Sequence, residues 1–153
     1  MLWAFQGDAA GQYPSGGLLH ASDGYLYGIS GIGTGGLNAQ VFRIKPDGSS
    51  YSSVYQFAPG IIVTSFTQGL VQGNGGKLYG VISACSPSCG IYPIVYPNGA
   101  VFSLDLGLPA ALPSIRYFEP GSGAAGATVL IRGDHLLGVT AVSFNGVPRS
   151  MGV

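Results

Sequence analysis

Apolar and polar residues alternate in the first third of the chain, and turn residues separate the alternating stretches. Apolar Phe42 and Ile44 alternate with basic Arg43 and Lys45 in the stretch Gln40-Val41-Phe42-Arg43-Ile44-Lys45. This is the two-residue period of a half-buried strand. Asp23-Gly24 and Pro46-Asp47-Gly48 are turn sequences, because glycine tolerates positive φ and proline presets φ. The pattern predicts a four-stranded antiparallel meander with strands over residues 18–21, 25–29, 40–45 and 51–57.

The same pattern returns later in the chain. Residues 22–29 correspond to residues 74–81 at an offset of 52, which also pairs Phe5 with Phe57, and Phe102 corresponds to Phe42 at an offset of 60. A period near 50 indicates an array of repeats or propeller blades. We therefore predict two four-stranded, propeller-blade-like repeats over about residues 6–57 and 58–106. Residues 1–5 match the end of a repeat, so we expect the chain to begin within one, with further repeats and any signal peptide upstream.

The last third of the chain has a different pattern. Residues 107–112 are small or proline-rich, as in a stiff linker between domains. Short apolar stretches over residues 114–118, 128–132 and 141–144 follow at the spacing of a β-sandwich, with Asn145-Gly146 as a turn signal. The predicted fold class is all-β, with residues 113–153 forming part of a sandwich.

Composition narrows the possible partners. Only 8% of the residues are charged, and six basic residues balance six acidic ones without clustering, so no surface for nucleic acid is predicted. No apolar run approaches the roughly 20 residues that cross a bilayer, so this segment is not expected to insert into a membrane. Glycine is abundant, at 27 of 153 residues, but a 46% apolar content is sufficient for a folded core.

Reactive residues do not converge in the sequence. His20 and His135 fall in different predicted domains, which argues against a histidine metal site or a catalytic triad. Asp23, Asp47 and Asp134 lie next to glycine or at turns, where a side-chain hydrogen bond to the turn is favoured over calcium binding. We therefore expect a protein that is not an enzyme and that holds no cofactor or metal.

Eight extra residues lie between Ser83 and Asn98 of the second repeat, and insertions in repeats often fall on the binding face. Cys85 and Cys89 lack nearby zinc ligands, which leaves a loop disulfide or two inert thiols. Tyr92 and Tyr96 are the candidate ligand contacts, with packing of the loop onto its own blade as the alternative.

Two family resemblances add to this interpretation. Asp23-Gly24, Gly35-Gly36, Val41-Phe42-Arg43-Ile44 and Asp47-Gly48 make residues 1–106 resemble the GloVer-type tandem repeat of bacterial cell-surface proteins with a choice of C-terminal anchors. The resemblance implies an extracellular or cell-surface location, and that setting favours a disulfide between Cys85 and Cys89.

The C-terminal part is similar to an IPT/TIG domain. The similarity rests on residues 113–123, on Gly126-Ala127-Thr128-Val129-Leu130-Ile131-Arg132-Gly133 and on Val142-Ser143-Phe144-Asn145-Gly146-Val147-Pro148. Such domains are immunoglobulin-like sandwiches of about twice this length, so residues 113–153 match the N-terminal half of one. The resemblance implies a spacer or interaction module without catalytic residues.

Two functions follow as hypotheses. The first is a non-catalytic extracellular or cell-surface bacterial protein that acts as a structural platform or binding module, with an extracellular glycan or protein as partner. The alternative is an ancillary fragment of a larger secreted polysaccharide-active enzyme whose catalytic domain lies in other sequence.

Overall fold

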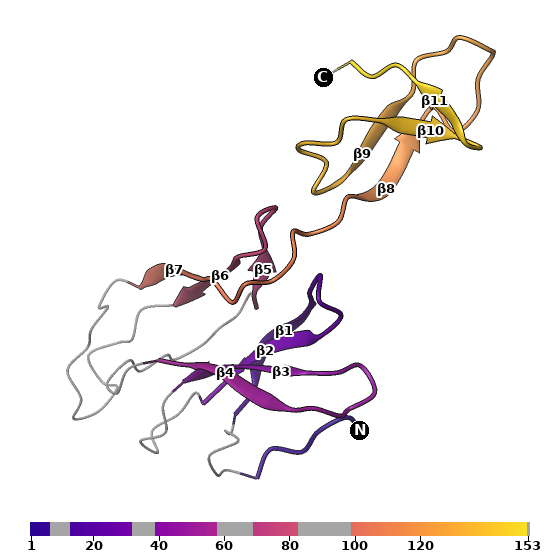
Figure 1. Ribbon diagram of the computed structural model, residues 1–153. Helices are drawn as coiled ribbons and strands as arrows, with labels where there is room; N and C mark the ends of the chain where they lie inside the picture. Colours follow the sequence, from indigo (N-terminus) through magenta and orange to yellow (C-terminus); the bar gives the residue numbers. More distant parts are fainter. Residues whose placement is uncertain (7–12, 32–38, 58–68, 83–98, 153) are drawn as a thin grey trace. The chain divides into compact units, whose positions relative to one another are not determined.

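The computed structural model describes residues 1–6, 13–31, 39–57, 69–82 and 99–152 (Figure 1). The strands, in chain order, are β1 (Ser15–His20), β2 (Leu26–Ser30), β3 (Gln40–Ile44), β4 (Ser52–Gln56), β5 (Val71–Gln72), β6 (Leu78–Ile82), β7 (Ala100–Leu104), β8 (Ser114–Glu119), β9 (Leu130–Asp134), β10 (Val142–Phe144) and β11 (Val147–Arg149). All pairings between them are antiparallel. The all-β prediction is confirmed for these residues, and none of them belongs to a helix that could cross a membrane.

The first sheet is the predicted four-stranded meander, in the order β1-β2-β3-β4. The turn between β1 and β2 is closed by the amide of Ala21, which donates to the carbonyl of Tyr25 at 2.9 Å, and Gly24 holds φ of +81°. Between β3 and β4, Gly48 holds φ of +87°. A side chain is strained at such φ values, so these glycines are what allow the chain to reverse.

The second sheet repeats the first hairpin. It has the order β5-β6-β7, and the amide of Gly73 donates to the carbonyl of Lys77 at 2.9 Å, with Gly76 at φ of +86°. Gly73, Gly76 and Lys77 lie 52 residues after Ala21, Gly24 and Tyr25. The offset found in the sequence therefore corresponds to one backbone geometry formed twice.

Among the described residues the second sheet has three strands, so the predicted fourth strand of this repeat is not found there. Residues 105–113, which follow β7, form no strand. The turn that sends the chain back after β3 needs glycine at position 48, and the residue 60 positions later is Leu108. Leucine resists the left-handed conformation that Gly48 adopts. The chain therefore leaves the second sheet after β7 without returning along it.

The two sheets pack face to face within one hydrophobic core. We define the forward face of the first sheet by Tyr27, Ile29 and Val41, and the rear face of each sheet by the opposite positions, such as Phe42 and Phe102. The forward face of the first sheet and the rear face of the second share the buried cluster, whose members are Ala21, Tyr27, Ile29, Ala39, Val41, Phe57, Leu70, Leu78 and Leu104. The first sheet therefore buries its forward face under the rear face of the second sheet.

Each rear face contains a glycine beneath a phenylalanine ring. Gly28 is directly opposite Phe42 across β2 and β3, and Gly80 is opposite Phe102 across β6 and β7. A Cβ atom at either glycine would lie 2.5 Å from the Cζ of the facing ring. The absence of a side chain at these two glycines lets the ring approach the backbone of the neighbouring strand, and the pair occurs in both sheets.

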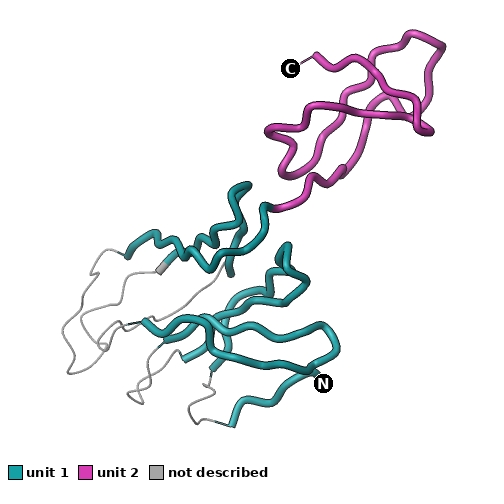
Figure 2. The backbone as a smooth tube through the Cα atoms, in the orientation of Figure 1, with its two compact units in different colours: residues 1–110 teal, residues 111–153 magenta. Residues whose placement is uncertain are grey.

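The chain divides into two compact units, residues 1–110 and 111–153 (Figure 2). In unit 2, β8 pairs with β9 and β10 pairs with β11. Asn145 and Gly146 both have positive φ, at 49° and 77°, as expected for the tight turn of a two-residue hairpin. β11 was not predicted. No described residue of unit 2 is fully buried, so this unit has two hairpins and no closed core among residues 111–152.

Candidate functional site

The residues predicted to form a disulfide or to contact a ligand lie outside the described residues. Cys85, Cys89, Tyr92 and Tyr96 all belong to the segment 83–98. The pairing of the cysteines and the role of the tyrosines therefore stay predictions.

Two of the three singled-out aspartates close turns, as predicted. The Oδ1 of Asp23 accepts from the amide of Tyr25 at 3.2 Å, and the Oδ1 of Asp47 accepts from the amide of Ser49 at 2.8 Å. Hydrogen bonds from the Ser49 side chain and backbone hold the pKa of the Asp47 carboxyl below its usual value. These carboxylates are used by the backbone around them, which is a structural role.

Asp134 differs from the prediction, because it lies in β9 and not at a turn. Its Oδ2 accepts from the Nε of Arg116 on β8 at 2.7 Å. The pair borders a shallow pocket of unit 2 whose lining residues are Arg116, Tyr117, Ile131, Arg132, Gly133, Asp134 and Leu136. The pairing of these two charges across the strands explains the position of Asp134 without a ligand.

The histidines are not brought together by either unit. His20 lies at the exposed end of β1 in unit 1, and His135 follows β9 in unit 2 with φ of 57°. Within the ranges that the structure describes, no three His, Cys, Asp or Glu residues gather in a way that could hold a metal ion.

A polar clamp joins the two repeats at the tip of the first hairpin. We name Ser22, Gln72 and Pro109 the hairpin clamp. The amide of Ser22 donates to the Oε1 of Gln72 at 2.9 Å, and the Nε2 of Gln72 donates to the Oγ of Ser22 at 2.7 Å and to the carbonyl of Pro109 at 3.1 Å. The amide group of one buried side chain thus connects the first hairpin, the second sheet and the segment after β7.

Sequence reasoning missed this clamp. The residue 52 positions before Gln72 is His20. Because the two repeats have different residues at this position, their comparison does not predict a role for Gln72. Gln72 points to the rear face of the second sheet, where it meets the hairpin that the first sheet presents. Only the packing of the two sheets reveals the clamp.

Replacing Gln72 by alanine is expected to destabilise unit 1 by about 1–2 kcal/mol. The substitution leaves the amide of Ser22 without its acceptor in a partly buried place, and an unmade hydrogen bond there costs about 1–3 kcal/mol. Urea denaturation would measure the difference. The matched control is Gln56→Ala on the exposed end of β4, which should change stability by less than about 0.5 kcal/mol. Equal effects at the two positions would contradict the role of the clamp.

A second polar group lies under the first hairpin. The hydroxyl of the fully buried Tyr27 donates to the Oδ2 of Asp23 at 2.8 Å, and the guanidinium of Arg43 lies 4.6 Å from the ring centre of Tyr25. Burial, and then the hydrogen bond to Asp23, raise the pKa of Tyr27 from 10.0 to about 12. The neutral phenol is therefore the form that the folded state holds.

Unit 1 is expected to lose stability in alkaline solution through Tyr27. The pKa of Tyr27 is higher in the folded than in the unfolded protein. The stability that the neutral phenol contributes is therefore complete below pH 10 and is lost as pH rises through about 12. A difference of about two pKa values corresponds to at most about 2.7 kcal/mol. The test is to measure the urea midpoint of unfolding between pH 10 and about 12 for the wild-type protein and for Tyr27→Phe. The stability of Tyr27→Phe should fall less steeply with pH. The same slope in both proteins would contradict the assignment.

One polar pair in the first sheet has no counterpart in the second. The Nε2 of buried Gln40 donates to the Oγ of buried Ser30 at 3.1 Å, while its Oε1 has no hydrogen-bond partner within the described ranges. At the corresponding positions the second sheet has Ile82 and Ala100. The two repeats therefore differ in polarity at the end of the sheet where β2 and β6 finish.

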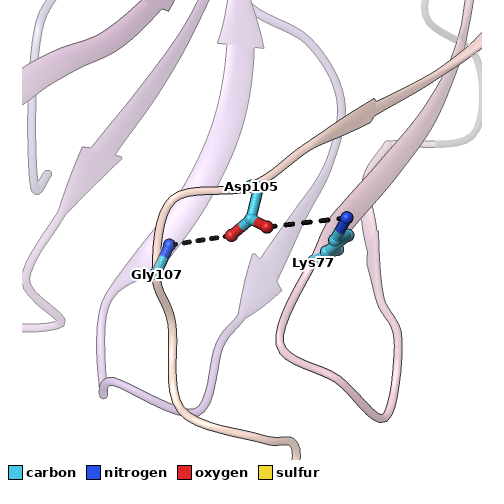
Figure 3. A network of polar contacts seen from close by, with 3 residues as sticks. All are labelled: Lys77, Asp105 and Gly107. Carbon is cyan, nitrogen blue, oxygen red and sulfur yellow. Dashed lines mark hydrogen bonds and ion pairs between the residues drawn. The ribbon is translucent and has the colours of Figure 1, made fainter.

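The exit of the chain from the second sheet is fixed by one carboxylate (Figure 3). The Oδ1 of Asp105 accepts from the amide of Gly107 at 3.2 Å, and its Oδ2 lies 3.5 Å from the Nζ of Lys77. Both side chains of this ion pair are exposed, so the pair itself contributes at most about 1 kcal/mol. The bond to Gly107 closes a turn directly after β7.

Searches against protein-family models, curated proteins and solved structures found no match to this chain. The resemblances to GloVer-type repeats and to IPT/TIG domains therefore stay predictions. What the described geometry provides is a pair of stacked sheets whose polar side chains connect turns, strands and repeats to one another.

Proposed function

We propose that this chain is a non-catalytic repeat protein of the bacterial cell surface or exterior, acting as a structural platform or binding module. The observation that carries the proposal is the stacking of one repeat on the next. Phe5 meets Phe42 edge to face at 5.3 Å between ring centres, and Phe57 meets Phe102 at 5.1 Å in the same way. Contacts that recur at the repeat offset are typical of proteins built by adding identical units.

The use of the aspartates supports a structural role. Asp23, Asp47 and Asp105 each accept a backbone amide at a turn, and Asp134 pairs with Arg116. A catalytic site needs several titratable groups facing one pocket. These four carboxylates instead lie at three separate turns and on one strand, each with a partner that accounts for its position.

The binding part of the proposal concerns the connections from β2 to β3 and from β6 to β7. Both leave their sheets from corresponding strand ends, and the second contains Tyr92 and Tyr96. Loops at one edge of a rigid β-scaffold are where binding residues commonly lie, and tyrosine rings suit sugar or protein surfaces. We propose an extracellular glycan or protein as the partner.

The test combines a glycan and protein binding screen with a panel of hydrolase substrates. Binding that is lost in Tyr92→Ala or Tyr96→Ala would support the proposal, provided that circular dichroism shows an unchanged fold. Tyr13→Ala, which changes an exposed tyrosine outside that loop, is the matched control and should bind normally. Turnover abolished by Asp23→Asn, Asp47→Asn or His20→Ala would overturn the non-catalytic assignment.

A further inference from the structure

The outer edge of β7 is regular and uncharged. Within the described residues β7 pairs with β6 alone, whereas its counterpart β3 pairs with both β2 and β4. All five residues of β7, in the sequence Ala-Val-Phe-Ser-Leu, pair with β6 without a register shift, and none of them is charged, glycine or proline. An edge of this kind carries a row of backbone N–H and C=O groups that can pair with a further strand.

The other outer strands of the two sheets have features that hinder pairing at an edge. β1 has extra residues relative to β2 between Ser15 and Leu19, where it contains two glycines. β4 has one extra residue, Val54, relative to β3, and β5 is only two residues long. Bulges and short strands are usual means by which proteins block an exposed edge. Among the described strands of unit 1, β7 is thus the one outer strand without such protection.

The segment that follows β7 is held away from this edge. The carbonyl of Pro109 accepts from the Oγ of Ser22 at 2.6 Å and from the Nε2 of Gln72 at 3.1 Å. Gln72 belongs to β5, which lies on the far side of β6 from β7. Residues 107–109 therefore lead towards β5, and the closed hairpin clamp keeps them there. A strand that pairs with β7 is not supplied by this segment.

The first sheet shows what kind of strand fits such an edge. β4 is uncharged, lies antiparallel to β3, and places Tyr55 opposite Val41. The residue that corresponds to Val41 at the offset of 60 is Val101, whose side chain is 76% exposed. An apolar side chain opposite Val101 would remove part of this surface from water. Neither β7 nor a strand like β4 carries a charge, so no like charges oppose the pairing.

We propose that β7 binds an extended segment of a partner protein as a fourth, antiparallel strand of the second sheet. The bound segment is uncharged over the length of β7 and carries an apolar or aromatic side chain opposite Val101. Main-chain hydrogen bonds provide the affinity in this mode of recognition, and alternate side chains provide the specificity. The inference goes beyond the proposed function, because it names a peptide-binding edge that is separate from the loop with Tyr92 and Tyr96 and is tested separately from it.

The first test uses a labelled synthetic peptide with the sequence of residues 51–57, Tyr-Ser-Ser-Val-Tyr-Gln-Phe, as the probe. Fluorescence anisotropy should show saturable binding of this peptide to the full chain. Two control peptides carry N-methyl groups on alternate amides, one on the even-numbered and the other on the odd-numbered residues. Only one set of amides faces β7 in an antiparallel ladder, so one control should bind about tenfold more weakly than the other. No saturable binding of the unmodified peptide, or equal binding of the two controls, would overturn the proposal.

The second test fixes the register by cross-linking. In a background of Cys85→Ser and Cys89→Ser, the chain carrying Ser103→Cys is mixed under oxidising conditions with the peptide carrying Ser52→Cys. In the first sheet Ser52 is opposite Arg43, the residue 60 positions before Ser103. Directly opposite residues of antiparallel strands have Cα atoms about 4.5–5.5 Å apart, within the range that a disulfide bridges. A disulfide between chain and peptide is therefore expected.

The matched control for the cross-link is Tyr79→Cys in the same background. Tyr79 is opposite Ser103 on β6, and so lies in the same row of the sheet but one strand farther from the added peptide. Neighbouring strands are about 4.8 Å apart, which puts Tyr79 beyond the reach of a disulfide to the peptide. Cross-linking to Ser103→Cys should be at least about tenfold faster than to Tyr79→Cys. Equal rates would overturn the proposed strand addition.

Discussion

Replacing Tyr27 by alanine is expected to destabilise unit 1 by about 3–5 kcal/mol. Tyr27 is fully buried between the two sheets and belongs to the shared core. Truncating a buried aromatic side chain removes its transfer free energy and leaves a cavity, which together cost about that much. The change also removes the hydroxyl that Asp23 accepts from.

Tyr79 supplies the matched control, because it occupies the same position in the second repeat but is partly exposed on the uncovered forward face. Tyr79→Ala should cost less than about 1 kcal/mol in a dilute, monomeric sample. Denaturant unfolding followed by fluorescence reports on unit 1 in both variants, since Trp3 is the single tryptophan and stacks on Tyr51. Similar losses at the two tyrosines would refute the packing of the first sheet under the second.

The second large effect is expected at Gly28. Gly28→Val should destabilise unit 1 by about 3 kcal/mol or more, because even its Cβ would lie 2.5 Å from the Cζ of Phe42 and 2.8 Å from the Cδ2 of Leu18. Added atoms in a packed site force side chains and backbone apart, typically at a cost of about 1–3 kcal/mol. Valine adds two methyl groups beyond the Cβ, so the cost of Gly28→Val should lie at the upper end of this range or above it.

Two further variants make this prediction specific. Gly17→Val places the same side chain on β1 at a position where a Cβ would meet no atom within 4 Å, so it should change stability by less than about 1 kcal/mol. Phe42→Leu removes the ring atoms that clash and should recover part of the loss when combined with Gly28→Val. A double-mutant cycle that finds the two changes additive would show that the ring is not the cause.

The strands of the first repeat could be predicted from the sequence because local rules decide them. Alternation over β3 and the turn glycines Gly24 and Gly48 act within a few residues. The structure confirms β1 to β4 within one residue at each end, except that β1 starts three residues earlier than predicted. The Phe42 and Phe102 correspondence likewise located β7. Local signals of this kind need no knowledge of what covers the sheet.

The difference between Tyr27 and Tyr79 could not be predicted in this way. Both lie in the sequence Leu-Tyr-Gly on a strand, and only the presence of a following sheet buries one of them. The segment 105–113, which forms no strand, is a different case, because the sequence itself has Leu108 at the position that corresponds to Gly48.

The polar contacts between the two sheets could not be predicted from the pattern of apolar and polar residues either. Gln72 acts on Ser22 across fifty positions, and no periodicity links them. For the candidate site, the sequence identified the turn roles of Asp23 and Asp47. The turn hydrogen bond favoured for Asp134, which follows Gly133, is not the role observed, because this side chain accepts from Arg116 on the neighbouring strand. The partners of Cys85, Cys89, Tyr92 and Tyr96 stay predictions.

The different lengths of the two corresponding connections bear on how such a chain could evolve. Residues 31–39 join β2 to β3, and residues 83–99 join β6 to β7, which is nine residues against seventeen. The glycine and phenylalanine partners keep the same pairing in both sheets despite this insertion. Doubling the length of a loop costs only about 0.6 kcal/mol in closure entropy. Mutations can therefore lengthen or replace this loop with little change to the stability of the sheets that carry it. New contacts that arise on the loop can then be selected.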